Sequence, residues 1–225
     1  MFDCKSLLVY FTIRKGDNKF MLKIYIARHG QNEDNANGIL NGHRDMPLTA
    51  IGEKQAHQLA EGIKNARLTF DAVYTSPLSR ASKTAEVVCE TLGMNKPVVL
   101  DSLIERDFGT MTGKPISDIE KLCAPDIVKT ETITYFLSPP GAETFPNLLE
   151  RAGRVLEKIR TEHSSGTILL VTHGDFGKMI YTAYYKLQWR DILTKFHFGN
   201  CELLLLAEDA DPNVPHVVHI EQHNH

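Results

Sequence analysis

Short apolar runs alternate along the chain with longer amphipathic stretches. The apolar runs predict strands at residues 23–27, 71–75, 97–101, 167–171 and 201–207, with a further candidate at 217–220. Apolar residues near helical spacing predict helices at residues 49–64, 79–92, 147–162 and 176–185. Thr49 has the side chain of an N-cap, and Gly93 is expected to end the second helix.

The interleaving of strands and helices indicates the fold class. It favours βαβ units and a mostly parallel sheet covered on both faces, which is an α/β fold of the three-layer α/β/α sandwich type. We expect residues 21–225 to form a single domain and residues 1–20 to be an extension that adds a strand or stays loose. Residues 110–145 are less regular and are expected to form an insert or lid. The prolines of this stretch are Pro115, Pro125, Pro139 and Pro140.

Composition limits the classes of partner. The chain has 225 residues and a formal net charge of -3, so it has no broad basic field, and neither nucleic acid nor a membrane is expected as a partner. A few focused arginines would still suffice for an anionic substrate. The cysteines form no close pair and are expected to be free thiols in the cytoplasm. They are Cys4, Cys89, Cys123 and Cys201.

Candidate chemistry follows the predicted strands. In open α/β sheets, ligands bind just beyond the carboxyl ends of the strands. The segments at those positions are Arg28-His29-Gly30, Thr172-His173-Gly174, Ser76-Pro77-Leu78-Ser79-Arg80 and Ser102-Leu103-Ile104-Glu105-Arg106. Two imidazoles, at least two guanidinium groups and a carboxyl group are therefore expected in one crevice.

This combination of groups suits phosphoryl transfer. Guanidinium groups bind phosphate oxygens in bidentate geometry. A neutral imidazole can attack phosphorus, and a carboxylic acid can protonate the leaving oxygen. Such chemistry needs mainly positioning and charge stabilisation, so no metal and no cofactor are expected.

The same residues resemble a known family. The motifs that carry the resemblance are Arg28-His29-Gly30-Gln31 with Asn35, Asn41-Gly42 and Asp45-Met46-Pro47-Leu48-Thr49; Ser76-Pro77-Leu78-Ser79-Arg80-Ala81; Glu105 with Phe108-Gly109; Pro140-Gly141-Ala142-Glu143-Thr144; and Val171-Thr172-His173-Gly174. In this order they are similar to the histidine phosphatase superfamily, the phosphoglycerate-mutase-like group. Within it they look most like the phosphatase branch that includes fructose-2,6-bisphosphatase-like enzymes.

The resemblance implies a role for each matching residue. His29 matches the phosphorylated histidine, Arg28 and Arg80 the phosphate clamps, His173 the second histidine and Glu105 the proton donor. The remaining expected substrate contacts are Asn35, Asn41, Gly42, Glu143, Thr144 and Gly174. The sequence departs from the family where Asn41 replaces a commoner Gln and where Ala142 replaces the second glycine of a Gly-Gly-Glu-Ser/Thr loop.

Three functions stay open at this level. The preferred one is a phosphatase that acts on a small phosphorylated metabolite, because the insert carries only Lys114, Lys121 and Lys129 as cations and no Arg-Arg pair for a phosphoglycerate carboxylate. The second is a cofactor-dependent phosphoglycerate mutase. The third is a non-catalytic protein that binds phosphate ligands. A homodimer is also compatible with the sequence.

Some nearby residues are assigned no function. Arg44 and Arg106 are interpreted as solvated, and His43 and His57 as facing solvent or capping local structure. The histidines of the tail have no spacing typical of a fixed ligand set, so no metal site is expected there. They are His216, His219, His223 and His225.

Overall fold

The computed structural model describes residues 21–219 and Gln222. Within them the main sheet is six-stranded, in the order β3-β2-β6-β1-β7-β8. Its strands are β1 (Leu22–Arg28), β2 (Ala72–Thr75), β3 (Val98–Val99), β6 (Gly166–Thr172), β7 (Leu203–Leu206) and β8 (His216–Val218). The expected extension at residues 1–20 lies outside the described residues.

The sheet is mostly parallel, as predicted. Strands β1, β2, β3 and β6 run in one direction, whereas β7 and β8 form an antiparallel edge beside β1. The register between β1 and β6 pairs Arg28 with Thr172. The residues that follow these two strands therefore emerge side by side at the carboxyl edge of the sheet.

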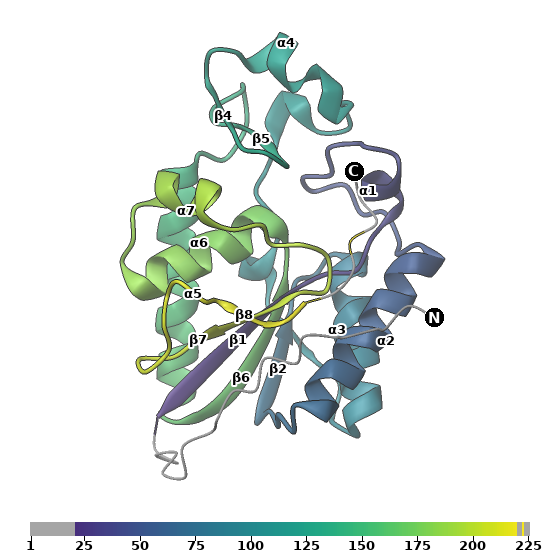
Figure 1. The fold of residues 1–225 in the computed structure, drawn as a ribbon, viewed down its shortest axis with the longest axis vertical. Coiled ribbons are helices and arrows are strands. Elements are labelled where there is room, and N and C mark those ends of the chain that lie inside the picture. The colour runs from purple at the N-terminus through teal and green to yellow at the C-terminus, as the bar shows by residue number, and fades with distance from the viewer. Residues whose placement is uncertain (1–20, 220–221, 223–225) are drawn as a thin grey trace, which may run out of the picture.

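Helices cover both faces and confirm the three-layer arrangement (Figure 1). Alternate residues of β1 face opposite cores, as the period of two in a strand requires. Tyr25 and Ala27 pack in the core under α2 (Ala50–Asn65) and α3 (Ser79–Leu92). Ile24 and Ile26 pack in the core formed with α5 (Phe145–Glu162), α6 (Gly174–Tyr185) and α7 (Trp189–Lys195).

Capping residues determine where the helices begin and end. Thr49 caps α2 by accepting a hydrogen bond from Gly52 N, and Gly93 ends α3 in the left-handed conformation, as predicted. Thr144 caps α5, so this helix begins two residues earlier than the sequence pattern indicated. The strand predicted at residues 97–101 is reduced to Val98–Val99, because Asp101–Leu103 form a 3-10 turn (η1).

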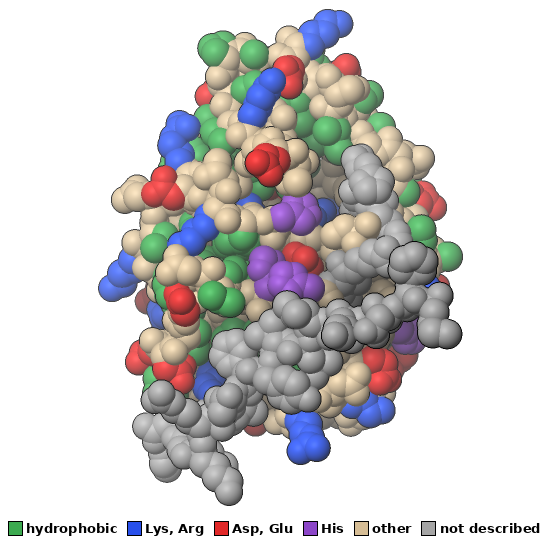
Figure 2. Space-filling view, viewed as in Figure 1, with side chains coloured by type: hydrophobic (Ala, Val, Ile, Leu, Met, Phe, Trp, Pro, Cys, Tyr) green, Lys and Arg blue, Asp and Glu red, His purple; other side chains and the backbone are tan. Residues whose placement is uncertain are grey.

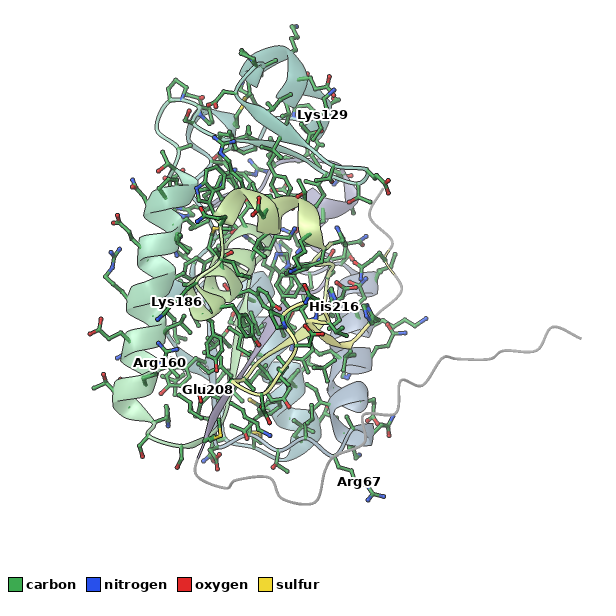
Figure 3. All side chains as sticks on the ribbon, turned by 60° about the vertical axis from the view of Figure 1, so that its left-hand side comes forward. Arg67, Lys129, Arg160, Lys186, Glu208 and His216 are labelled. Carbon is green, nitrogen blue, oxygen red and sulfur yellow. The ribbon has the colours of Figure 1, made fainter. Side chains whose placement is uncertain are left out.

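The irregular stretch forms a small subdomain over the carboxyl edge of the sheet, at the top of Figure 1. We call residues 109–136 the insert. Its elements are η2 (Gly109–Met111), η3 (Ile116–Asp118), α4 (Ile119–Cys123), β4 (Ile127–Lys129) and β5 (Thr134–Phe136). Strands β4 and β5 form an antiparallel hairpin that the sequence pattern did not predict. Lys129 of β4 marks the insert in Figure 3.

The insert has a core of its own. Phe108, Met111, Ile119 and Phe136 pack there with Leu40, which follows the short helix α1 (Glu33–Ala36). The insert is thus attached to the loop after β1, which also supplies the candidate site. No helix in the described part of the chain is long and apolar enough to cross a membrane.

Candidate active site

Two histidines meet where β1 and β6 end. The backbone N–H of His29 donates to the Thr172 carbonyl at 3.0 Å, which extends the parallel ladder by one residue. The rings of His29 and His173 consequently lie 5.1 Å apart between centroids, at 60° to each other. The register of the sheet brings together two side chains that are far apart in the sequence.

The hydrogen bonds of His29 fix its tautomer. Nδ1 lies 2.7 Å from the carbonyl oxygen of Gly30, which can only accept, so Nδ1 carries the proton. Nε2 therefore holds a lone pair, and Arg80 Nε donates to it at 3.2 Å. Burial, followed by the charges of Arg80 and Arg28, holds the pKa of His29 well below its usual value. The ring is neutral at physiological pH, which is the state that a nucleophile requires.

Arg80 is fully buried in the first turn of α3 and is fixed in place by backbone carbonyls. Its terminal nitrogens donate to the carbonyls of Arg44 and Gly42 at 2.6 and 3.0 Å. Burial lowers the pKa of Arg80 to about 10, so it keeps its charge at neutral pH. Gly42 thus contacts Arg80 through its carbonyl group.

Arg28 is the second cation beside His29. Its Nη1 donates to the carbonyl of Phe198 at 2.8 Å. Its Nε is buried and has no hydrogen-bond partner among the described residues. A buried guanidinium donor without a partner favours an anion close by, because an unmade charged hydrogen bond is costly.

His173 is also buried and neutral. Burial, with the charge of Arg80 next, lowers its pKa well below the usual value. Its Nε2 lies 2.7 Å from the hydroxyl of Ser76, while its Nδ1 has no partner among the described residues. The hydroxyl of Ser76 accepts from Leu78 N and can donate its own proton to Nε2, and in that tautomer the His173 proton resides on Nδ1. His173 can donate this proton to a phosphate oxygen.

Glu105 provides the carboxyl group of the site. It is buried and accepts hydrogen bonds from the backbone of Arg106 and from Phe176 in the first turn of α6. Burial and the neighbouring charge of Asp175 raise its pKa, and they outweigh the opposing backbone hydrogen bonds and Arg80. The raised pKa favours the protonated form of Glu105.

One cavity joins most of the predicted residues. The predicted site residues that line it are Arg28, His29, Asn35, Asn41, Arg80, Glu105 and Gly174. Side-chain hydrogen bonds with Asn32 hold Asn41 at the cavity wall. Asn35 accepts a hydrogen bond from Asn200 at 3.4 Å. The shorter Asn41 therefore still lines the site where the family commonly carries Gln.

Two predicted substrate residues are engaged elsewhere. Glu143 forms a bidentate ion pair with Arg151, and Thr144 accepts a hydrogen bond from Asn147 N as the cap of α5. Neither residue lines the cavity, and neither do Gly42 and His173, although the His173 ring lies beside that of His29. Arg151 also donates to the carbonyls of Ser102, Ile104 and Glu105, so Glu143 reaches the site only indirectly, by positioning the loop that holds Glu105.

The interpretation of Arg106 as solvated was wrong. Its side chain is 1% exposed, forms an ion pair with Asp175 at 2.8 Å and lies over the rings of Phe108, Phe136 and Phe145. Its position directly after Glu105 could have indicated that it lies near the site. The ion pair with Asp175 could not be predicted, because it depends on tertiary structure. Further cavity residues that the sequence did not identify include Tyr135, Asp175, Lys178 and Phe198.

Comparisons with known proteins agree with this geometry. The family described as histidine phosphatase superfamily (branch 1) matches residues 24–220. A 2,3-bisphosphoglycerate-dependent phosphoglycerate mutase of Parvibaculum lavamentivorans is 30% identical over 174 residues, which are 76% of this chain and 83% of the mutase. The uncharacterized phosphatase PhoE of Bacillus subtilis is 32% identical over 155 residues, which are 68% of this chain and 72% of PhoE.

A solved structure extends the similarity to three dimensions. The phosphoserine phosphatase of Entamoeba histolytica, in complex with 3-phosphoglyceric acid, aligns with a TM-score of 0.67 and 26% identity, covering 82% of this chain and 90% of that one. The family match spans most of the chain, and relatives by sequence and by structure agree with it. The chain belongs to the histidine phosphatase superfamily.

Proposed function

We propose that the chain is a phosphatase that hydrolyses small phosphomonoesters through a phosphohistidine on His29, without a metal ion or another cofactor. The observation that carries this proposal is the state of His29. Its Nδ1 proton is held by Gly30, and its Nε2 lone pair lies beside Arg80, within a cavity that Arg28 also lines. A neutral nucleophile surrounded by phosphate-binding donors is what the first chemical step requires.

In the first step, the Nε2 lone pair of His29 forms a bond to phosphorus while the bond from phosphorus to the leaving oxygen breaks. Glu105 gives its proton to that oxygen, so the product leaves as a neutral alcohol. Arg80 Nε, which donates to Nε2 in the free protein, transfers its hydrogen bond to a phosphate oxygen when the substrate binds. Arg28 and His173 donate to the remaining oxygens.

In the second step, the Glu105 carboxylate takes a proton from water, and the water oxygen attacks the phosphohistidine. The P–N bond breaks and its electron pair returns to Nε2. His29 and Glu105 thereby regain their initial states, and orthophosphate is released.

The walls of the cavity favour hydrolysis over a mutase reaction. Mutase action on a phosphoglycerate needs a cation for the substrate carboxylate. The cavity-lining cations other than Arg28 and Arg80 are Arg106 and Lys178. Arg106 is paired with Asp175, and Lys178 donates to the carbonyls of Ile192, Leu193 and Phe196.

The outer wall of the cavity indicates the class of alcohol. Its lining includes apolar side chains of the insert, of the residue directly before it and of the loop after β1, namely Ile39, Leu40, Phe108, Ile116, Ile133 and Phe136. An apolar wall disfavours a second charged group because such a group would lose its hydration there. We therefore propose monoesters of uncharged alcohols as substrates.

The test is release of orthophosphate from a panel of monoesters in the presence of EDTA, with 3-phosphoglycerate as the carboxylate-bearing member. We expect hydrolysis by the wild type, preference for uncharged alcohols, and loss of activity in His29→Ala. The matched control is His57→Ala, an exposed histidine on α2, which should leave the rates unchanged. Trapping the wild type with acid-labile, base-stable ³²P on histidine would identify the intermediate.

The alternatives give different results. Isomerisation of 3-phosphoglycerate without net phosphate release, dependent on a 2,3-bisphosphoglycerate primer, would favour the mutase. Binding of phosphate esters with no turnover, unchanged in His29→Ala, would favour a non-catalytic binding protein.

A further inference from the structure

A second group of potential ligands lies at the antiparallel edge of the sheet. Glu202, directly before β7, is approached by His216 of β8 and by His219, which follows it. His216 Nε2 lies 3.1 Å from one carboxylate oxygen, and His219 Nδ1 lies 3.4 Å from the other. His216 is labelled in Figure 3, and histidines gather beside an acidic side chain on the face shown in Figure 2.

The spacing of these atoms fits a tetrahedral metal ion. One ligand atom from each residue lies within 4.8 Å of the others. Bonds of about 2.1 Å in a tetrahedral zinc site place neighbouring ligand atoms about 3.4 Å apart. His216 Nε2 lies 3.1 Å from one carboxylate oxygen of Glu202, which is close to the separation that a shared ion needs, and 3.0 Å from the carbonyl of His197, a contact that it would exchange for the ion. His219 Nδ1 lies 3.4 Å from the other carboxylate oxygen.

The charge and exposure of the group also suit a cation. The carboxyl group of Glu202 accepts a hydrogen bond from Gly199 N and faces the imidazoles of His216 and His219. The side chains of Glu202 and His216 are 8% and 11% exposed, whereas that of His219 is 69% exposed. Two ligands are thus held in place, and the third can close over an ion that reaches it from solvent.

We propose that Glu202, His216 and His219 form a binding site for Zn²⁺, with a fourth position open to solvent. Two imidazoles and one carboxylate form a recognised zinc-binding combination. Nitrogen ligands disfavour Mg²⁺ and Ca²⁺, which prefer oxygen. The spacing of the tail histidines matches no fixed ligand set, so the sequence predicted no metal site there, and it is the fold that adds Glu202.

The site is separate from the catalytic cavity but connected to it through the backbone. The carbonyl of Glu202 accepts from Arg28 N at 3.3 Å, and Asn200, two residues earlier, donates to the His29 carbonyl. A bound ion would tie β8 to the start of β7 and so restrain the turn behind His29. The expected consequence is a more stable protein, since an ion that binds only the folded state stabilises it.

The test uses the full chain with His223 and His225 replaced by Gln, so that these residues cannot supply ligands. After chelation and dialysis, binding of Zn²⁺ is measured by calorimetry, with Mg²⁺ as the comparison. We expect one Zn²⁺ per chain, no Mg²⁺ binding, a higher midpoint of thermal unfolding with Zn²⁺, and a Co²⁺ spectrum of a four-coordinate site. His219→Gln should weaken Zn²⁺ binding about tenfold or more.

His219→Gln is the decisive variant because its exposed ring is the least important for packing. Glu202→Gln should weaken binding as well, although it also alters the hydrogen bond from Gly199 N. His57→Gln, on α2, is the matched control and should bind Zn²⁺ as the parent does. Equal Zn²⁺ binding by the parent and His219→Gln, or absence of stoichiometric binding, would overturn the proposal and leave the group as a hydrogen-bonded network around Glu202.

Discussion

His29 and Glu105 are shifted in opposite directions by the same buried environment. Desolvation disfavours the charged form of each, so it lowers the pKa of the histidine and raises the pKa of the carboxyl group. The nearby arginines lower the pKa of His29 further, and Asp175 raises that of Glu105. The result is a window of pH in which a neutral imidazole faces a protonated acid, the pair of states that the first step uses.

The first prediction is a bell-shaped pH profile of kcat/KM. Activity should fall as pH decreases through the lowered pKa of His29, because the nucleophile becomes protonated. It should also fall as pH rises through the raised pKa of Glu105, because the general acid loses its proton.

In Glu105→Gln the basic limb of the pH profile should disappear, and kcat/KM for alkyl phosphates should fall about 10²–10⁴-fold. The decrease in kcat/KM should be smaller for p-nitrophenyl phosphate, because its leaving group needs little protonation. An unchanged basic limb in Glu105→Gln would contradict the assignment.

A second prediction concerns Asp175. Its charge is the main influence, after burial, that raises the pKa of Glu105. Asp175→Asn removes that charge but keeps an oxygen that can accept from Arg106 Nε. The pKa of Glu105 should then decrease, and the basic limb of the pH profile should move to lower pH. Asp191→Asn, an exposed residue of α7, is the matched control, and a basic limb that stays in place in Asp175→Asn would refute the coupling.

At the scale of elements, sequence patterns predicted the central strands and the helices better than the edge strand β3 and the strands of the insert. Strands β1 and β6 were predicted because continuous apolar runs are typical of buried parallel strands. The exposed strand β3 has only two residues, fewer than predicted, and the sequence did not predict the β4–β5 hairpin. Tertiary contacts stabilise these short elements, such as the packing of Phe136 on Phe108, and no local pattern encodes those contacts.

Thr144 provides a third prediction, at the element scale. The family resemblance suggested that Thr144 contacts substrate, whereas its hydroxyl caps α5 by accepting from Asn147 N at 3.4 Å. Thr144→Ala should lower the free energy of unfolding by about 1 kcal/mol and leave kcat/KM unchanged. Urea denaturation and steady-state kinetics would be measured together. Thr144→Ser keeps the cap and should behave like the wild type. A loss of kcat/KM in Thr144→Ala with unchanged stability would restore the substrate role.

At the scale of the whole molecule, the site draws residues from segments throughout the described chain. The motifs predicted which groups would meet, because each follows a strand whose carboxyl end lies at the same edge of the sheet. They did not predict how Arg106, Asp175 and Arg151 support Glu105. Those contacts join the η1 loop, α6 and α5, and only the packed layers bring these elements together. The sequence therefore predicted which groups lie together at the site but not the residues that support them.

The last prediction follows from the distribution of the site residues over several helices and strands. An anion that binds Arg28, His29 and Arg80 contacts β1 and α3 together, so it should stabilise the fold as a unit. Orthovanadate at about one hundred times its Kd should add about 2.7 kcal/mol of stability, which raises the unfolding midpoint by roughly 5–10 °C in a chain of this size. Arg28→Gln should reduce the shift in a thermal unfolding assay because it removes the unpartnered Nε donor, whereas His57→Gln should preserve it. An equal shift in Arg28→Gln would mean that the anion binds outside the catalytic cavity.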